Sequence, residues 1–277
     1  MFSLIVATVG RDIEIERLLD SLSIQTIKKN LFEIIIVDQN KEINLEPIVK
    51  KYTKMLNIIH IKAQNLGLSR NRNVGLKIAK GNIVAFPDDD CTYYPDTLES
   101  VLKYFETNSS TDSVFGQIID LEKNKKIIRN WPVKDVEIST SNFFMLYSSI
   151  TIFTKLKDVK FDERLGVGEF FGSYEDADYT LSLIENGNSF YYSPTIKVWH
   201  PELNVKTMSI DKIQSYGLGF GALCKKHFSI QIFILFSKAI VYHFYKLCAG
   251  MLKFNVQEVK KRYYSIVYRF VGFAKFK

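Results

Sequence analysis

The first ninety residues alternate short apolar, β-branched runs with longer segments in which apolar residues recur every three or four positions. The short runs are typical of buried strands, and the longer segments are typical of amphipathic helices. Strands are expected at residues 2–7, 32–37, 58–61 and 83–86, and helices at about 15–22, 45–55 and 69–80. This βαβα order predicts an α/β domain with a parallel sheet of the nucleotide-binding type.

The pattern loosens after residue 90, where strand-like runs no longer alternate regularly with helical segments. A helix is expected at 96–105, strands at 113–119, 149–153 and 190–198, a Gly-rich loop at 166–172, and a helix from Glu175 to Asn186. We therefore expect a domain at 1–205 with a donor half at about 1–110 and an acceptor half at about 111–205. A boundary near Lys206 is expected to begin a helical extension at 206–277.

The basic charge of the chain is concentrated in this extension. The net charge is +7, yet from Lys206 onward thirteen Lys and Arg face only two acidic residues. Gln231, Lys238, Lys246 and Lys253 are spaced seven, eight and seven apart in an otherwise apolar segment, so on a helix they form one stripe. Because two lysines interrupt the roughly 20 apolar residues that a span needs, a helix lying on an anionic membrane surface is expected from residues 228–277. The alternative is a helix packed against the domain.

Other features of the composition suggest a cytoplasmic protein. The apolar amino terminus reaches Arg11 too soon for a signal peptide, and Cys91, Cys224 and Cys248 form no metal or redox pattern. The basic extension leaves a nucleic-acid-binding protein as an alternative from a different class, but no nucleic-acid motif accompanies it, so nucleic acid is not an expected partner.

Three consecutive aspartates, Asp88, Asp89 and Asp90, follow the apolar run 83–86 and Pro87. In an extended segment side chains alternate, so Asp88 and Asp90 should project together and Asp89 away from them. Ligands bind outside the carboxyl ends of the strands in open α/β sheets, where Mg²⁺ or Mn²⁺ joins carboxylates to a substrate phosphate. One interpretation is a metal–diphosphate site, and the other is a solvated Asp-rich turn before the helix at 96–105.

Polar residues also follow the other expected strands, and they should converge on the same edge of the sheet. Thr8, Gly10 and Arg11 follow the first strand, and Asp38 follows the second. Asp38 is able to accept hydrogen bonds from a base or ribose, and Gly10 would let a ligand approach the backbone. Asn65 precedes two arginines, Arg70 and Arg72, at a helix start, where phosphate binds readily, although a solvated turn would have the same composition.

These segments together resemble the family 2 glycosyltransferases of the bacterial polysaccharide, capsule and O-antigen type, which have the A-type nucleotide-sugar transferase fold. The residues that carry the resemblance are 3–8, 36–38, 65–75, 81–90 and 175–178, within a similarity over roughly residues 2–200. It implies a Rossmann-like fold with a mixed, mainly parallel central sheet. It also implies that Asp38 contacts the nucleobase, Asp88 the ribose or sugar and Asp90 a Mn²⁺ or Mg²⁺ ion. Gln39-Asn40 depart from the usual acidic, glycine and serine residues of the family, which leaves the base open.

The resemblance also assigns chemistry to the Glu175-Asp176 pair. Similar enzymes use this aspartate as the general base that deprotonates the acceptor hydroxyl, which implies that role for Asp176 beside Glu175. The alternative is that both are acids in the first turn of a helix, where they favour the helix dipole. His200 is a candidate third metal ligand because some related transferases have a metal-binding histidine in this region, although a structural histidine is equally compatible.

The segment Tyr216–Gly221 is superficially similar to a dinucleotide fingerprint, but no strand or acidic partner accompanies it. We expect a flexible segment over the active site, with Tyr216, Lys225, Lys226 and His227 close to the departing diphosphate.

The expected function is an inverting, metal-assisted transfer of a sugar from a nucleotide diphosphate to a hydroxyl group of a lipid-linked or polysaccharide acceptor. The expected location is the cytoplasm, with peripheral attachment to the inner face of the cell membrane, and homo-oligomerisation stays open. A nucleotidyltransferase acting on a sugar phosphate is the alternative within the same fold, but no Gly-rich triphosphate loop is visible. The expected donor-binding residues are Thr8, Gly10, Arg11, Asp38, Asn65, Arg70, Asp88 and Asp89.

Overall fold

The computed structural model describes residues 1–202 and 208–277, which divide into two compact units. The first unit comprises Met1–Leu66, Arg70–Lys160 and Ser182–Leu203, and the second comprises Gly67–Ser69, Phe161–Leu181 and Asn204–Lys277. The boundary predicted near Lys206 lies outside the described residues, so the predicted domain limits stay predictions.

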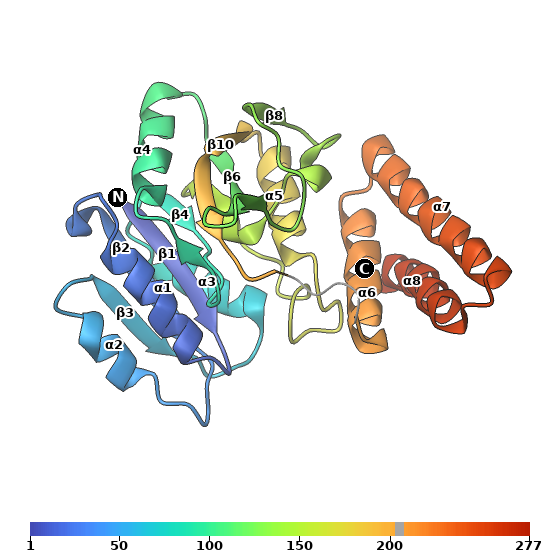
Figure 1. The fold of residues 1–277 in the computed structure, drawn as a ribbon, viewed down its shortest axis with the longest axis horizontal. Helices are drawn as coiled ribbons and strands as arrows, with labels where there is room; N and C mark the ends of the chain where they lie inside the picture. The colour runs from blue at the N-terminus through green and yellow to red at the C-terminus, as the bar shows by residue number, and fades with distance from the viewer. Residues whose placement is uncertain (203–207) are drawn as a thin grey trace. The chain divides into compact units, whose positions relative to one another are not determined.

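A mixed sheet forms the centre of the first unit (Figure 1). Its strands are β1 (Phe2–Thr8), β2 (Phe32–Asp38), β3 (Ile58–Lys62), β4 (Ile83–Ala85), β5 (Thr92–Tyr93), β6 (Ser113–Asp120), β7 (Lys125–Lys126), β8 (Val136–Ile138), β9 (Ile152–Lys155) and β10 (Phe190–Trp199). The main order is β3-β2-β1-β4-β9-β6-β10-β5, with β7 paired to β6 and β8 to β10. The first four strands are parallel, whereas β9 runs antiparallel to both neighbours and β10 is parallel to β6.

The helices of the first part of the chain alternate with these strands, as the hydrophobic pattern predicts. They are α1 (Ile13–Ser23), α2 (Glu46–Tyr52), α3 (Leu68–Ile78) and α4 (Thr97–Thr107), with short 3-10 turns at Lys29–Leu31, Phe143–Met145 and Ser149–Thr151. Helix α1 buries Ile15, Leu18, Leu19 and Leu22, the apolar face expected from their spacing. The predicted α/β class with a mixed sheet is confirmed.

The buried parallel strands bring the polar residues that follow them to one edge of the sheet. Every residue of β2 is buried, and β1 is buried except for its half-buried Ala7. Helix α3 packs closely on β1, since a Cβ at Gly75 would overlap the side chain of Ile5. The parallel register places Thr8 beside Asp38, so the polar residues that follow β1 and β2 emerge together.

Three long helices make up most of the second unit: α6 (Ile210–Lys226), α7 (Ile230–Leu252) and α8 (Val256–Lys275). The start of α5 (Glu175–Glu185) also belongs to this unit. Helices α6 and α8 pack with little space between their backbones, because a Cβ at Gly217, Gly221 or Gly272 would overlap atoms of the facing helix. The prediction of a flexible segment at Tyr216–Gly221 is therefore wrong: it lies inside α6, and Gly217–Gly221 are buried. Glycines at this spacing form a close helix–helix contact, which resembles a loop pattern in the sequence.

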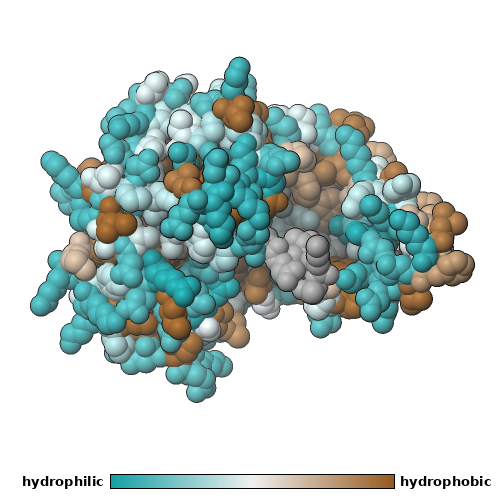
Figure 2. All heavy atoms as spheres, in the orientation of Figure 1, coloured by the Kyte–Doolittle hydropathy of each residue, from teal (hydrophilic) through white to brown (hydrophobic). Residues whose placement is uncertain are grey.

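Helix α7 is the one helix among the described residues that is long and apolar enough to cross a membrane by length and composition. Contrary to the expectation from the sequence, Lys238 and Lys246 do not exclude a membrane span by these two criteria. Little of α7 is buried, and large apolar side chains remain exposed at its end and in the following turn, where Leu252 is 82% exposed and Phe254 is 92% exposed. Figure 2 shows hydrophobic residues gathered where α7 and α8 meet. Length and composition alone are weak evidence for a span, because helices of soluble proteins also meet them.

Candidate active site

The acidic residues after β4 lie in a turn and not in an extended segment. The amide of Cys91 donates to the carbonyl of Asp88 at 3.2 Å, which closes the turn over Asp89 and Asp90. Asp88 and Asp90 nevertheless share a side, and Asp89 points elsewhere. The carboxylate of Asp89 accepts hydrogen bonds from the Thr8 hydroxyl at 2.7 Å and the Arg11 guanidinium at 2.8 Å. Asp89 thus ties this turn to the end of β1.

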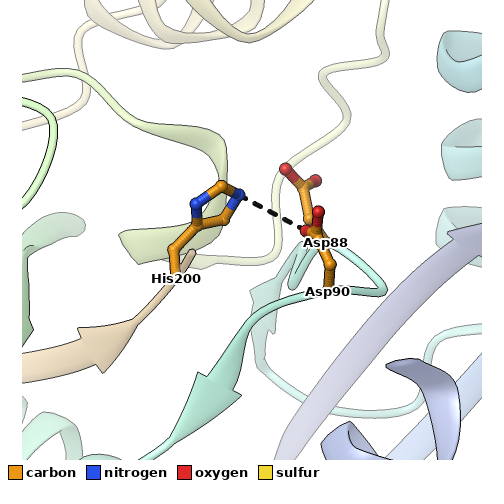
Figure 3. Close-up of side chains that lie close together, drawn as sticks. All are labelled: Asp88, Asp90 and His200. Atoms are coloured by element: carbon orange, nitrogen blue, oxygen red, sulfur yellow. Dashed lines mark ion pairs between the residues drawn. The ribbon is translucent and has the colours of Figure 1, made fainter. Parts of the chain in front are cut away.

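Asp88, Asp90 and His200 form a group of candidate metal ligands (Figure 3). One ligand atom from each lies within 4.8 Å of the other two, although His200 follows β10, more than 100 residues away in sequence. The imidazole Nε2 lies 3.3 Å from a carboxylate oxygen of Asp90, while Nδ1 lies 2.6 Å from the carbonyl of Pro201. A donor set of two carboxylates and one imidazole fits Mn²⁺ well and suits Mg²⁺ less, because imidazole is a softer ligand.

The carboxylates of this group are balanced by nearby cations. Asp90 pairs with both Arg11 and His200, and Asp88 pairs with Arg72 at 2.9 Å. Burial alone would raise the pKa of Asp90, but its bonds to His200 and Arg11 outweigh burial and lower the pKa to about 2. Burial raises the pKa of Asp89 to about 6, and burial also raises that of Asp88 despite the charge of Arg72. Asp90 therefore stays ionised at neutral pH, as a metal ligand must.

Asp38 is completely buried at the end of β2, where four groups donate to it or face it. The backbone amide and side chain of Asn40 donate to one carboxylate oxygen at 2.8 and 2.9 Å. Lys62 and His60 of β3 lie 2.9 and 3.0 Å from the other oxygen. Burial opposes ionisation, but these bonds lower the pKa of Asp38. Its carboxylate is thus a fixed negative charge, and the amide of Gly10, with φ +74, bonds to the Asn40 side chain nearby.

The candidate donor-binding residues before and in α3 differ in burial and in their partners. Asn65 is exposed, and its carbonyl accepts a hydrogen bond from Asn71 at 3.0 Å. Arg70 is half-buried, whereas Arg72 is buried, with the guanidinium that pairs with Asp88. Arg72 is the second of the two arginines that the sequence places at this helix start. It, and not Arg70, is the one whose pairing with Asp88 brings it to the candidate metal ligands.

The acidic start of α5 lies in the second unit. Glu175 and Asp178 are buried, and Asp176 is half-buried with a carboxylate oxygen 2.8 Å from the amide of Ala177. Burial raises the pKa of Tyr216, and the charges of Asp176 and Glu175 raise it further, so this tyrosine lies close to both acids. Asp176 is the most accessible carboxylate of the three, which fits a group that must reach a substrate.

Two of the three basic residues expected near the leaving group are engaged elsewhere. Lys226 and His227, at the end of α6, each lie 2.8 Å from an oxygen of the buried Asp178. Lys226 also pairs with Asp162 at 2.9 Å. Lys225 is exposed with its ammonium 5.4 Å from the ring centre of Phe273. The Asp178 pairs fasten the start of α5 to the end of α6.

The chain is similar in sequence to known proteins. The model of the family described as glycosyl transferase family 2 matches residues 3–167. A Staphylococcus aureus protein named poly(ribitol-phosphate) beta-N-acetylglucosaminyltransferase TarP is 26% identical over 194 residues, covering 68% of this chain and 58% of that protein. A Campylobacter jejuni protein named GalNAc(5)-diNAcBac-PP-undecaprenol beta-1,3-glucosyltransferase is 29% identical over 203 residues, covering 71% of this chain and 63% of that protein.

Solved structures share the fold. TarS 1–349 of S. aureus in complex with UDP-GlcNAc matches with a TM-score of 0.59 and 21% identity, covering 82% of this chain and 71% of that one. The mannosyltransferase PcManGT from Pyrobaculum calidifontis in complex with GDP-Man and Mn²⁺ has a TM-score of 0.62 and 14% identity, covering 99% and 87%. The chain spans about 60% of the length of some of the curated relatives it matches and less than a quarter of the length of others.

Proposed function

Because the chain belongs to glycosyl transferase family 2, we propose that it moves a sugar from a nucleotide diphosphate to a hydroxyl group of a lipid-linked or polysaccharide acceptor, with inversion. The observation that carries the proposal is the convergence of Asp88, Asp90 and His200 at the edge of the sheet where β1 and β2 also end. Convergence of this kind is what a nucleotide-sugar site in an α/β sheet requires.

The donor would lie along the ends of β1, β2 and β4. The buried carboxylate of Asp38 would hold Asn40 and Lys62 in place at the base end of the donor, and Gly10 would leave room for the donor beside the backbone. Asp88, Asp90 and His200 would hold a divalent cation, whose charge would offset the negative charge that develops on the leaving diphosphate. Thr8 and Arg11 would fix the acidic turn through Asp89.

Asp176 is the proposed general base. Its carboxylate would take the proton of the acceptor hydroxyl as that oxygen attacks the anomeric carbon, while the bond to the diphosphate oxygen breaks on the opposite face. A single displacement with this geometry inverts the configuration. Asp178 is unsuited to this role because its buried carboxylate already pairs with Lys226 and bonds to His227.

We place the protein at the inner face of the cell membrane as part of the same proposal. The exposed apolar side chains of α7 and the turn after it support this, together with the basic residues of α8. Each basic residue near an anionic surface adds about 1 kcal/mol of attraction.

The test begins with nucleotide sugars screened for Mn²⁺-dependent thermal stabilisation of the full chain, because ligand binding raises apparent stability by mass action. With the donor identified, Asp176→Asn should retain donor binding and lose transfer by roughly 10²–10⁴-fold, the usual contribution of a general base. Glu185→Gln, which changes an exposed carboxylate at the other end of the same helix, serves as the control. Unchanged transfer in Asp176→Asn would remove the proposed base, and stabilisation by no nucleotide sugar would count against the function itself.

A further inference from the structure

The helices of the second unit enclose a cavity of about 580 Å³ to which the proposed reaction assigns no role. Three cationic side chains of α8 line it: Lys261, Arg262 and Arg269. Glu258 is the one carboxylate among the lining residues, and Arg262 already bonds to it at 2.8 Å. The cavity therefore has an excess of positive charge that an anionic ligand would balance.

Arg269 is a cation of this cavity whose hydrogen-bond donors are not all satisfied. Among the residues that the structure describes, no carboxylate pairs with it, and its buried Nε has no hydrogen-bond partner. One of its terminal nitrogens donates to the carbonyl of Ser265 at 2.7 Å, and its guanidinium lies 5.1 Å from the ring centre of Phe220. Burial lowers the pKa of Arg269, and the nearby charge of Arg262 lowers it further. A half-buried guanidinium with unused donors is a suitable partner for a phosphate or carboxylate.

A shallow apolar groove lies along one face of α7 in the same unit, and the contact of Arg262 with Tyr242 links it to the cationic cavity. It follows α7, has a volume of about 530 Å³, and is lined by exposed side chains that include Phe233, Val241 and Tyr245. Tyr242 lines this groove, while the guanidinium of Arg262 lies 5.5 Å from its ring centre and 3.3 Å from Nδ1 of His243 in the cavity. Arg262 therefore joins the cationic cavity to the apolar groove, an arrangement that suits a molecule with an anionic head and an apolar tail.

The cavity also lies next to the proposed base. Tyr174 and Tyr216 line it with their rings edge to face at 6.2 Å, and Tyr174 directly precedes Glu175 and Asp176. Tyr174 has φ +68, a conformation that strains a residue with a side chain and that clusters at functional sites.

We propose that the cavity binds the diphosphate of a lipid-linked acceptor, whose apolar tail lies along the α7 groove. Arg262, Arg269 and Lys261 hold the diphosphate, and the acceptor hydroxyl reaches Asp176 past the two tyrosines. The assignment of the ligand as the acceptor rests on the proposed function, whereas the binding of a lipid diphosphate does not. Charge alone would also attract phospholipid headgroups or the nucleoside diphosphate that leaves the donor, so the test separates these sources.

The experiment measures binding of geranyl diphosphate to the full chain by isothermal titration calorimetry with EDTA present, which keeps the metal-dependent donor site out of the measurement. We expect Arg269→Gln to weaken binding at least ten-fold. Lys260→Gln, an exposed neighbour of the cavity on α8, is the matched control and should bind as the wild type does. Because Arg269 packs on Phe220 and its loss could disturb folding, Lys261→Gln is tested beside it, with thermal unfolding of each variant recorded.

A second pair of probes separates the head from the tail. Val241→Asp, in the exposed groove, should weaken binding of geranyl diphosphate and leave binding of inorganic pyrophosphate unchanged. The proposal is overturned if geranyl diphosphate does not bind, if both cavity variants bind it as the wild type does, or if phosphatidylglycerol vesicles bind while both diphosphate probes do not. It is also overturned if UDP competes for the cavity as strongly as geranyl diphosphate. Failure of the proposed function would appear separately, as loss of Mn²⁺-dependent donor stabilisation with lipid diphosphate binding intact.

Discussion

Replacing Gly221 by alanine tests whether residues 216–221 are a packed helix. In an isolated helix this change would stabilise the helix by about 1 kcal/mol, because alanine is the better helix former. In this protein the new methyl group would overlap the carbonyl oxygen of Arg269 and lie 2.5 Å from the backbone nitrogen of Phe273. Both atoms belong to the backbone of α8 and have no rotamer that relieves the contact. The two effects therefore have opposite signs.

We expect the unfavourable contact with α8 to outweigh the gain in helix propensity. Overpacking a close contact costs typically 1–3 kcal/mol, and more where backbone must shift. We take the upper part of that range, about 2–3 kcal/mol, because backbone atoms must shift here. After subtraction of the helix gain, we expect a net loss of about 1–2 kcal/mol in the free energy of unfolding, or a fall in Tm of about 2–8 °C for a protein of this size. Gly250→Ala in α7 is the matched control, since its methyl group would meet a side-chain carbon of Val259 at 3.1 Å, and that side chain is able to move.

Urea unfolding followed by far-UV circular dichroism measures both variants. If Gly221→Ala unfolds at the same urea concentration as the wild type or at a higher one, the α6–α8 contact is not as close as described. A flexible segment over the active site would then be the better description of residues 216–221, and the cavity beside α8 would lose one of its walls.

Three further changes test other parts of the account. Asp178→Asn should lower the free energy of unfolding by about 1.5–3 kcal/mol, because it removes the buried carboxylate to which Lys226 and His227 are bonded; a loss below about 0.5 kcal/mol in urea unfolding would contradict these contacts. Asp38→Asn should abolish donor binding in a thermal-shift assay and leave Mn²⁺ binding in place, so equal donor affinity would remove Asp38 from the base site. Burial, with the charges of the neighbouring arginines, lowers the pKa of His243 to about 3, so protonation of this histidine favours the unfolded state. The free energy of unfolding should therefore fall as the pH drops from about 6.5 toward 3, by up to about 1.4 kcal/mol per pH unit. His243→Gln should flatten that slope in urea unfolding measured across this range, and an unchanged slope would disprove the assignment.

The parallel part of the fold was predictable because its signals are local. Apolar runs at β1, β2, β3 and β4 alternate with amphipathic segments, and buried parallel strands require this composition. The polar residues at the strand ends followed from the same logic, since parallel strands end at one edge. Asp88 and Asp90 do converge, although a turn brings them together and not the alternation of an extended strand.

The remaining parts depend on contacts between residues that are distant in sequence. Nothing near Asp88 indicates that Arg72 is its partner, and nothing near Asp178 indicates Lys226 or His227. The glycines of α6 were misleading for the same reason. Glycine in a sequence indicates a loop when its neighbours are unknown, but here it allows the backbone of α8 to approach.

Binding of Mn²⁺ tests the central claim most directly. Electron paramagnetic resonance of free Mn²⁺, titrated with the full chain in the presence of the stabilising nucleotide sugar, gives the affinity of the site. Asp90→Asn and His200→Ala should each weaken binding by about ten-fold or more, since both remove a ligand from the group formed with Asp88. Asp12→Asn, which changes an exposed helix-capping aspartate, should bind as the wild type does. Equal Mn²⁺ affinity in all four proteins would contradict a metal site at the end of β4.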